Sequence, residues 1–66
     1  MKLTIRFTQL DATAVSFLER SVRPYRVEIV QSGVETVLTA DCSKEAAMRI
    51  IALTSCFEHH EVTLRQ

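Results

Sequence analysis

Hydrophobic and polar residues alternate strictly over residues 2–8, which predicts a strand with one buried face. A helix is predicted next, because Asp11 can cap its first turn and Pro24 stops it. Its apolar side is expected to hold Ala14, Val15, Leu18 and Val22, with Phe17 on the flank.

Alternation returns over residues 25–31 and again over residues 34–40, with a Ser-Gly dipeptide at 32–33 between them. Glycine adopts positive φ without strain, so this dipeptide predicts the two-residue loop of a hairpin. The resulting register places Ile29 opposite Thr36 and gathers most of the apolar side chains on one face.

A second helix is predicted from a cap at Ser43 or Asp41, and residues 59–65 alternate again as a last strand. The apolar stripe of this helix is expected to consist of Ala46, Ile50, Leu53 and Phe57, widened by Ala47 and Thr54.

The predicted order is β-α-β-β-α-β, which resembles the ferredoxin-like split βαβ fold of the α+β class. This resemblance implies a four-stranded antiparallel sheet with both helices on one face and the other face open. The first and third strands would be central, and the second and fourth would be edges. The six elements use nearly all of residues 1–66, so one domain is expected.

Composition argues against secreted disulfide-rich proteins and membrane proteins. The chain has 66 residues, and eight Lys and Arg balance eight Asp and Glu. Cys42 and Cys56 are too few for a secreted disulfide framework, and the start of the chain lacks a signal-peptide pattern. With no apolar run near membrane length, we expect a cytoplasmic protein with reduced thiols and no membrane partner.

Nucleic-acid binding is a less favoured expectation. RNA-recognition-motif proteins resemble this topology and stack bases on aromatic side chains of the open sheet face. The positions expected on the open face of the first and third strands, within residues 2–8 and 34–40, hold no aromatic residue. The zero net charge also removes the general electrostatic attraction to phosphates.

Metal binding and catalysis are not expected either. Cys56, His59 and His60 form a Cys-x-x-His-His run, but Cys42 lies at the other end of the second helix, so four ligands do not converge. The loop at residues 8–11 lacks the cysteines of copper-chaperone-like domains and the arginine of acylphosphatase-like enzymes, which share the topology. We therefore expect a non-enzymatic protein with no catalytic residues, no cofactor and no small-molecule substrate.

Surface features favour a protein partner instead. Three arginines cluster where the first helix joins the second strand, and arginine is enriched at protein interfaces. The second strand is a predicted edge without Lys or Pro in its interior, so it could accept another strand. The expected contact residues are Arg6, Arg20, Arg23, Arg26, Glu28, Val30, Val37 and Met48.

Together these patterns predict a small protein-binding regulator. Several anti-CRISPR proteins are similar in size and general plan, and this resemblance implies an inhibitor that sterically occludes a larger protein or nucleoprotein machine. A protein-binding surface of this kind could also bind a second copy of the chain, so a homodimer is a further expectation. The alternative is a nucleic-acid-associated module whose phosphate contacts are Arg6, Arg20, Arg23 and Arg26.

Overall fold

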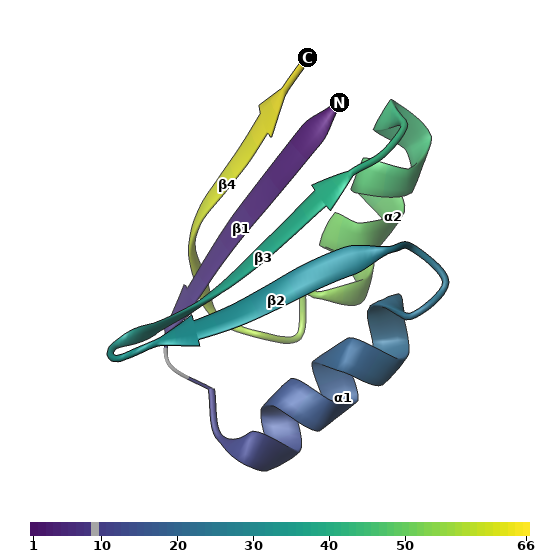
Figure 1. The fold of residues 1–66 in the computed structure, drawn as a ribbon. Coiled ribbons are helices and arrows are strands. Elements are labelled where there is room, and N and C mark those ends of the chain that lie inside the picture. The colour runs from purple at the N-terminus through teal and green to yellow at the C-terminus, as the bar shows by residue number, and fades with distance from the viewer. Residues whose placement is uncertain (9) are drawn as a thin grey trace.

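The strand β1 (Lys2–Thr8) lies inside a four-stranded antiparallel sheet, between β3 (Glu35–Asp41) and β4 (His59–Arg65) (Figure 1). The strand β2 (Val27–Ser32) pairs with the far side of β3, so the spatial order is β2-β3-β1-β4. This order confirms the predicted ferredoxin-like arrangement, with the first and third strands in the centre.

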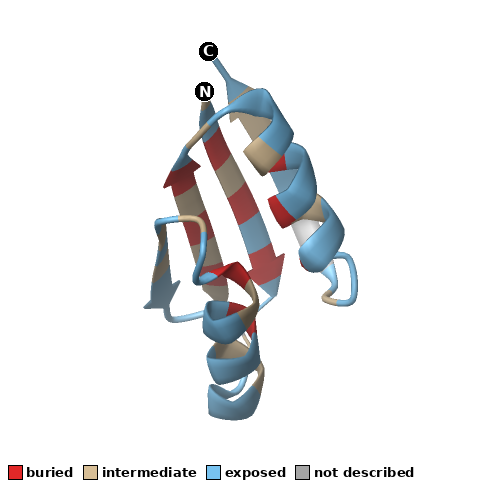
Figure 2. Cartoon of the chain, turned by 90° about the vertical axis from the view of Figure 1, so that its right-hand side faces the viewer, coloured by how far each residue is buried: buried red, intermediate tan, exposed pale blue. Residues whose placement is uncertain are grey.

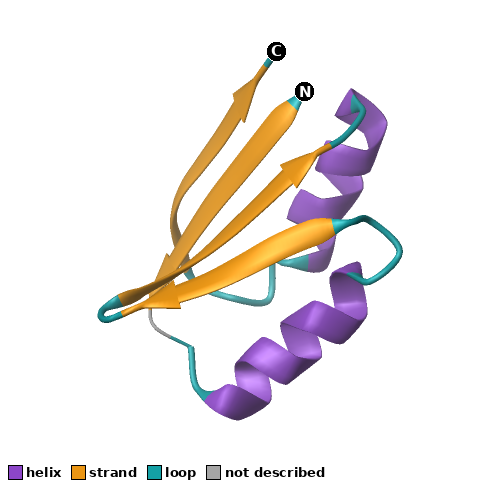
Figure 3. Ribbon diagram, viewed as in Figure 1, coloured by secondary structure: helices purple, strands orange, loops and turns teal. Residues whose placement is uncertain are grey.

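Two helices, α1 (Ala12–Val22) and α2 (Lys44–Leu53), lie on the same side of the sheet (Figure 3). Each helix begins at a side-chain cap. The carboxylate of Asp11 and the hydroxyl of Ser43 each accept a hydrogen bond from the amide three residues on, at 2.7 and 3.1 Å. These caps satisfy amides that the first helical turn leaves without partners, and they fix where each helix starts.

The computed structural model describes residues 1–8 and 10–66, except for the side chains of His59 and His60. Gln9, in the first loop, thus lies outside the described residues. Neither helix in the described ranges combines the length and the apolar character that are needed to cross a membrane.

The core lies between the helices and the two central strands. Figure 2 shows buried residues alternating with less buried ones along these strands, as expected when one sheet face is covered. The buried hydrophobic side chains are Leu3, Ile5, Phe7, Leu18, Val22, Leu38, Ala40, Ala47 and Ile50.

The hairpin between β2 and β3 closes one residue later than the sequence predicts. Gly33 and Val34 form the loop, and Gly33 has a φ of 48°. Ile29 consequently lies opposite Leu38 rather than Thr36. Because this register differs from the predicted one by two residues, every side chain keeps its expected face.

The buried side of α2 is rotated relative to the predicted stripe. Ala47, Ile50 and Thr54 are fully buried, whereas Leu53, predicted to face inward, is 42% exposed. The hydroxyl of Thr54 donates to the Ile50 carbonyl at 3.0 Å, so this polar side chain is buried with its hydrogen bond made. Ala47 and Thr54, which were expected to widen the stripe, thus form its buried centre with Ile50, and Leu53 lies at its border.

The rotation of α2 can be tested by truncating one buried and one exposed side chain. We expect Ile50→Ala to lower the free energy of unfolding by about 2–5 kcal/mol, since it leaves a cavity in the core. Leu53→Ala should cost less than about 1 kcal/mol, because its side chain is largely in water. Urea denaturation of both variants checks this, and a larger loss for Leu53→Ala would contradict the observed orientation.

The hairpin loop makes a second prediction. No heavy atom lies within 4 Å of a Cβ built on Gly33, so a substitution there acts through the backbone conformation. We expect Gly33→Ala to lower the free energy of unfolding by about 1 kcal/mol, and Gly33→Asn to cost clearly less, because Asn tolerates positive φ. Equal losses in thermal or urea denaturation would show that the positive φ at this position is not what limits stability.

Candidate functional site

The structure distributes the predicted contact residues over four places. Arg23 and Arg26 line a groove beside β2, Arg20 lies on the outer side of α1, Met48 lies on the exposed side of α2, and Arg6, Glu28, Val30 and Val37 lie on the open face of the sheet. The predicted set is therefore not one surface.

The open sheet face carries a small apolar pair and a local ion pair. Val30, which is 49% exposed, lies directly opposite Val37 on the neighbouring strand. Arg6 lies opposite Val37 on its other side, and its Nε is 3.8 Å from Oε1 of Glu61. Arg6 is thereby paired across β1 and β4, and β3 separates its strand from β2, beside which Arg23 and Arg26 lie.

A tight connection joins α1 to β2 and positions two of the arginines. The helix ends at Val22 with Arg23 as its C-cap, and the amide of Tyr25 donates to the carbonyl of Val22 at 2.9 Å. β2 begins at Val27, two residues later than the alternation predicts. Arg23 and Arg26 therefore lie on opposite sides of one short turn.

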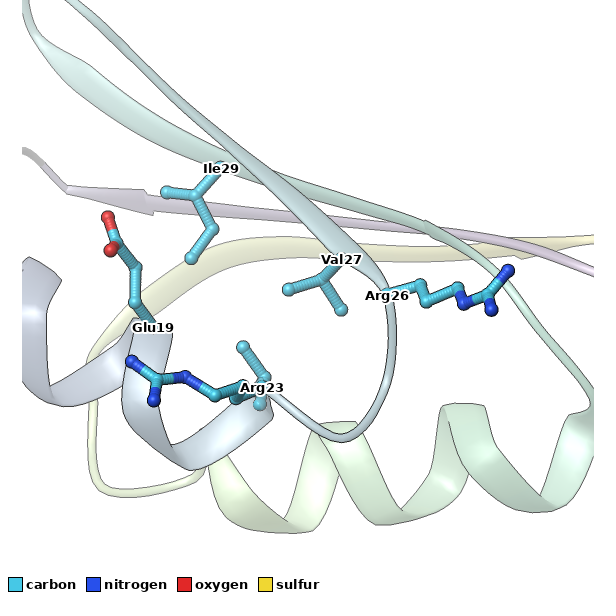
Figure 4. Close-up of a pocket in the computed structure, with 6 residues that line it drawn as sticks. Glu19, Arg23, Arg26, Val27 and Ile29 are labelled. Carbon is cyan, nitrogen blue, oxygen red and sulfur yellow. The ribbon is translucent and has the colours of Figure 1, made fainter.

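A groove of about 300 Å³ runs between the end of α1 and the edge strand β2. The partly buried Val27 and Ile29 supply the exposed apolar part of its floor over the fully buried Val22, and its rims are polar. Glu19 and Arg23 rise from α1 along one rim (Figure 4).

Arg26 occupies the border between this groove and the open sheet face. Its side chain points away from Val27 and Ile29 in Figure 4, and it also lines a hollow on the open face together with Glu28. Arg23 and Arg26 therefore flank the start of β2 on its helix side and its open side, respectively.

Within the described part of the chain, the arginines of α1 and of the following turn take part in no ion pair. Among the described residues, the ion pairs are those of the Met1 amino group with Asp41, at 3.9 Å, and of Arg6 with Glu61. The guanidinium groups of Arg20, Arg23 and Arg26 thus form no salt bridge with any described side chain. An arginine without an internal partner retains its full capacity for a bidentate contact with a carboxylate.

The outer edge of β2 borders the groove. In the described parts of the chain, β3 is the sole strand paired with β2. The sequence of β2, Val27–Ser32, contains neither Lys nor Pro, the residues that commonly protect an exposed edge. Edge and groove together form a continuous side of the molecule that offers backbone hydrogen bonds, apolar area and positive charge.

The sequence identified the arginines and the edge but missed the lining residues Glu19, Val22, Val27 and Ile29. One signal was available. Val27 and Ile29 alternate on the helix-facing side of a strand that the topology places at an edge, where cover by a single helix is incomplete. The space above them depends on the distance between α1 and β2, which no local pattern determines.

Two other exposed features lie away from the groove. Met48 on α2 is 55% exposed, and no groove-lining residue comes from α2. Phe17 on α1 is 50% exposed, but its ring is in edge contact with Phe57, which in turn contacts the buried Phe7. Phe17 thus extends the aromatic part of the core to the surface.

The cysteines do not come together. Cys42 is partly buried just before α2, and the exposed Cys56 follows its end. Across residues 1–8 and 10–58, together with 61–66, no group of three or more His, Cys, Asp and Glu side chains is arranged to hold a metal ion. The side chains of His59 and His60 lie outside the described residues, so the Cys-x-x-His-His run stays untested.

Comparison of the chain with protein-family models, curated proteins and solved structures finds no match.

The groove arginines should be dispensable for folding. Arg23 and Arg26 are exposed and form no described ion pair, so the double variant Arg23→Ala/Arg26→Ala should change the free energy of unfolding by less than about 0.5 kcal/mol. Thermal denaturation followed by circular dichroism checks this. A loss comparable to that of a core truncation would mean that these side chains support the fold.

Proposed function

We propose that this protein is a small non-enzymatic module that binds another protein through the groove between α1 and β2 and the adjoining edge of β2. The groove carries this proposal, because its apolar floor lies beside an unprotected strand edge and is flanked by arginines without ion pairs. Apolar area rimmed by arginine is the composition typical of protein interfaces.

The placement of charge supports a protein partner over a nucleic acid. The alternative uses Arg6 together with Arg20, Arg23 and Arg26, but Arg6 lies on the open face and pairs with Glu61. Arg20 lies on the outer side of α1, and Arg23 and Arg26 border a groove where the partly buried Val27 and Ile29 offer nothing to a phosphate backbone. A partner with both apolar and acidic side chains would use both parts of this surface.

In this proposal the module acts by occlusion, as an inhibitor or regulator does. The whole chain exposes 4567 Å². A standard interface buries about 800 Å² on each partner, so one interface of this size would bury most of the side formed by α1 and β2. A bound module would then block the corresponding area of its partner without changing it chemically.

Quantitative affinity purification from the native host tests the proposal. The baits are the wild-type chain, Arg23→Ala/Arg26→Ala, and the matched control Arg49→Ala, which removes an exposed arginine from α2. We expect one protein to be retained by the wild type and the control, and to bind at least about tenfold more weakly to the double variant, because two charge-assisted contacts are lost.

Two outcomes would contradict the proposal. Equal retention of every captured protein by the three baits would exclude the groove arginines from binding. Capture that disappears after nuclease treatment, or that weakens steeply with salt as phosphate contacts do, would favour the nucleic-acid alternative.

A further inference from the structure

The hairpin geometry determines which backbone groups of β2 point away from the sheet. With Gly33 and Val34 as a two-residue loop, Ser32 and Glu35 are the flanking pair, and the flanking pair of such a hairpin exchanges both hydrogen bonds. Hydrogen-bonded and non-hydrogen-bonded pairs then alternate along the ladder. The amides and carbonyls of Val27, Ile29 and Gln31 therefore point outward.

The same alternation directs the side chains of these residues. Val27 lies opposite Ala40 and Ile29 opposite Leu38, both of which are buried on the helix-facing side of the sheet. Their side chains reach into the groove, as Figure 4 shows. A strand aligned along β2 would thus find backbone partners at Val27 and Ile29 and an apolar groove for its own side chains on the helix-facing side.

Charge selects the composition of that strand. Arg23 flanks the groove on the helix side and Arg26 flanks it on the open side, while Glu19 is the acidic residue lining the groove. On the open face Arg26 shares a hollow with Lys2, Glu28 and Asp41, and Asp41 is paired with the Met1 amino group. With Arg20 one helical turn before Arg23, the basic side chains at this end of β2 still outnumber the acidic ones. An acidic segment is attracted here, and a basic one is repelled.

We propose that the partner inserts an extended segment as a fifth strand along β2, with apolar side chains at alternate positions in the groove and acidic side chains beside Arg23 and Arg26. This inference rests on the proposed function and specifies how the partner is bound. The backbone hydrogen bonds supply affinity without sequence preference, and the groove and the arginines supply the preference.

Two other occupants of this surface are outcomes of the test. A helical segment would fill the groove but would leave the outward amides of Val27, Ile29 and Gln31 without partners. A second copy of this chain, paired edge to edge, would satisfy those amides but would appear as a dimer in sedimentation velocity.

The first experiment selects binders from a phage-displayed library of short linear peptides against the purified wild-type chain. We expect enriched sequences to place apolar residues at every second position and to contain an excess of Asp and Glu. The variant Arg23→Glu/Arg26→Glu should enrich Lys and Arg in place of the acidic residues, and the control Arg49→Glu should select as the wild type does. Enriched peptides with helical spacing, or no enrichment at all, would overturn the inference.

The second experiment measures amide hydrogen exchange by NMR with a selected peptide bound. The amides of Val27, Ile29 and Gln31 should exchange at least about tenfold more slowly, because they gain partners. The amides of Glu28 and Val30 should change little, since they already bond to β3. Protection without this alternation, or alternating protection already present in a free dimer, would overturn addition of a partner strand.

The two proposals fail separately. A captured protein that depends on Arg23 and Arg26 but leaves the β2 amides unprotected would retain the protein-binding function and reject strand addition. A captured protein that is insensitive to both arginines would reject the proposed function itself, whatever the peptide selection yields.

Discussion

The helix-facing side of the sheet is tightly covered at its centre and incompletely covered at its edges, and the remaining features of the molecule follow from this gradient. The inward side chains of β1 and the inward Leu38 of β3 are fully buried. On the edge strands the helices cover the inward side chains only in part. Val27 and Ile29 of β2 are partly buried, and Val62 of β4, opposite the buried Ile5, is 38% exposed. Two helices of 11 and 10 residues are short, at about 15 Å each, so cover is concentrated where it protects most apolar area.

The groove lies where this burial decreases, between α1 and the edge strand β2. Only two side chains of α1, Leu18 and Val22, are fully buried, and a groove remains between the end of this helix and β2. The chain must then turn within a few residues to start β2, and this turn carries Arg23 and Arg26 to the end of the groove. The net charge of zero conceals this arrangement, because several acidic residues lie away from the groove, as with Glu61 beside Arg6. The apolar floor of the groove and the two arginines therefore lie together because the connection from α1 to the edge strand β2 is short.

The sequence was sufficient for the fold and pointed to the arginines and the strand edge of the proposed site, but it did not reveal the groove. Alternation and caps predicted six elements in the right order. The hairpin loop was misplaced because a glycine fits either position of a two-residue loop. A loop at residues 32–33 of the type with two positive φ values would force Ser32 into that region, whereas the observed loop needs it at Gly33 alone. On α2 the inward positions of Ala47, Ile50 and Thr54 were predicted, but Leu53 was wrong, because Thr54 satisfies its hydroxyl within the helix and can be buried in preference to Leu53. The groove depends on contacts between segments that are separated in the sequence by a turn, and hydrophobic patterning does not encode such distances.

An uncovered edge in so small a domain couples binding to stability. A domain of this size buries a modest share of its surface. Each inward side chain that stays partly exposed therefore contributes less hydrophobic stabilisation to the free domain than it would if it were fully buried. A strand placed along β2 would cover Val27 and Ile29 and give partners to the outward backbone groups, and any ligand that binds the folded state alone raises its stability by mass action. Proteins that expose an edge without such use usually protect it with Lys or Pro, and β2 has neither. In the proposed binding mode, the same incomplete cover that weakens the free domain provides the surface that the partner strand occupies.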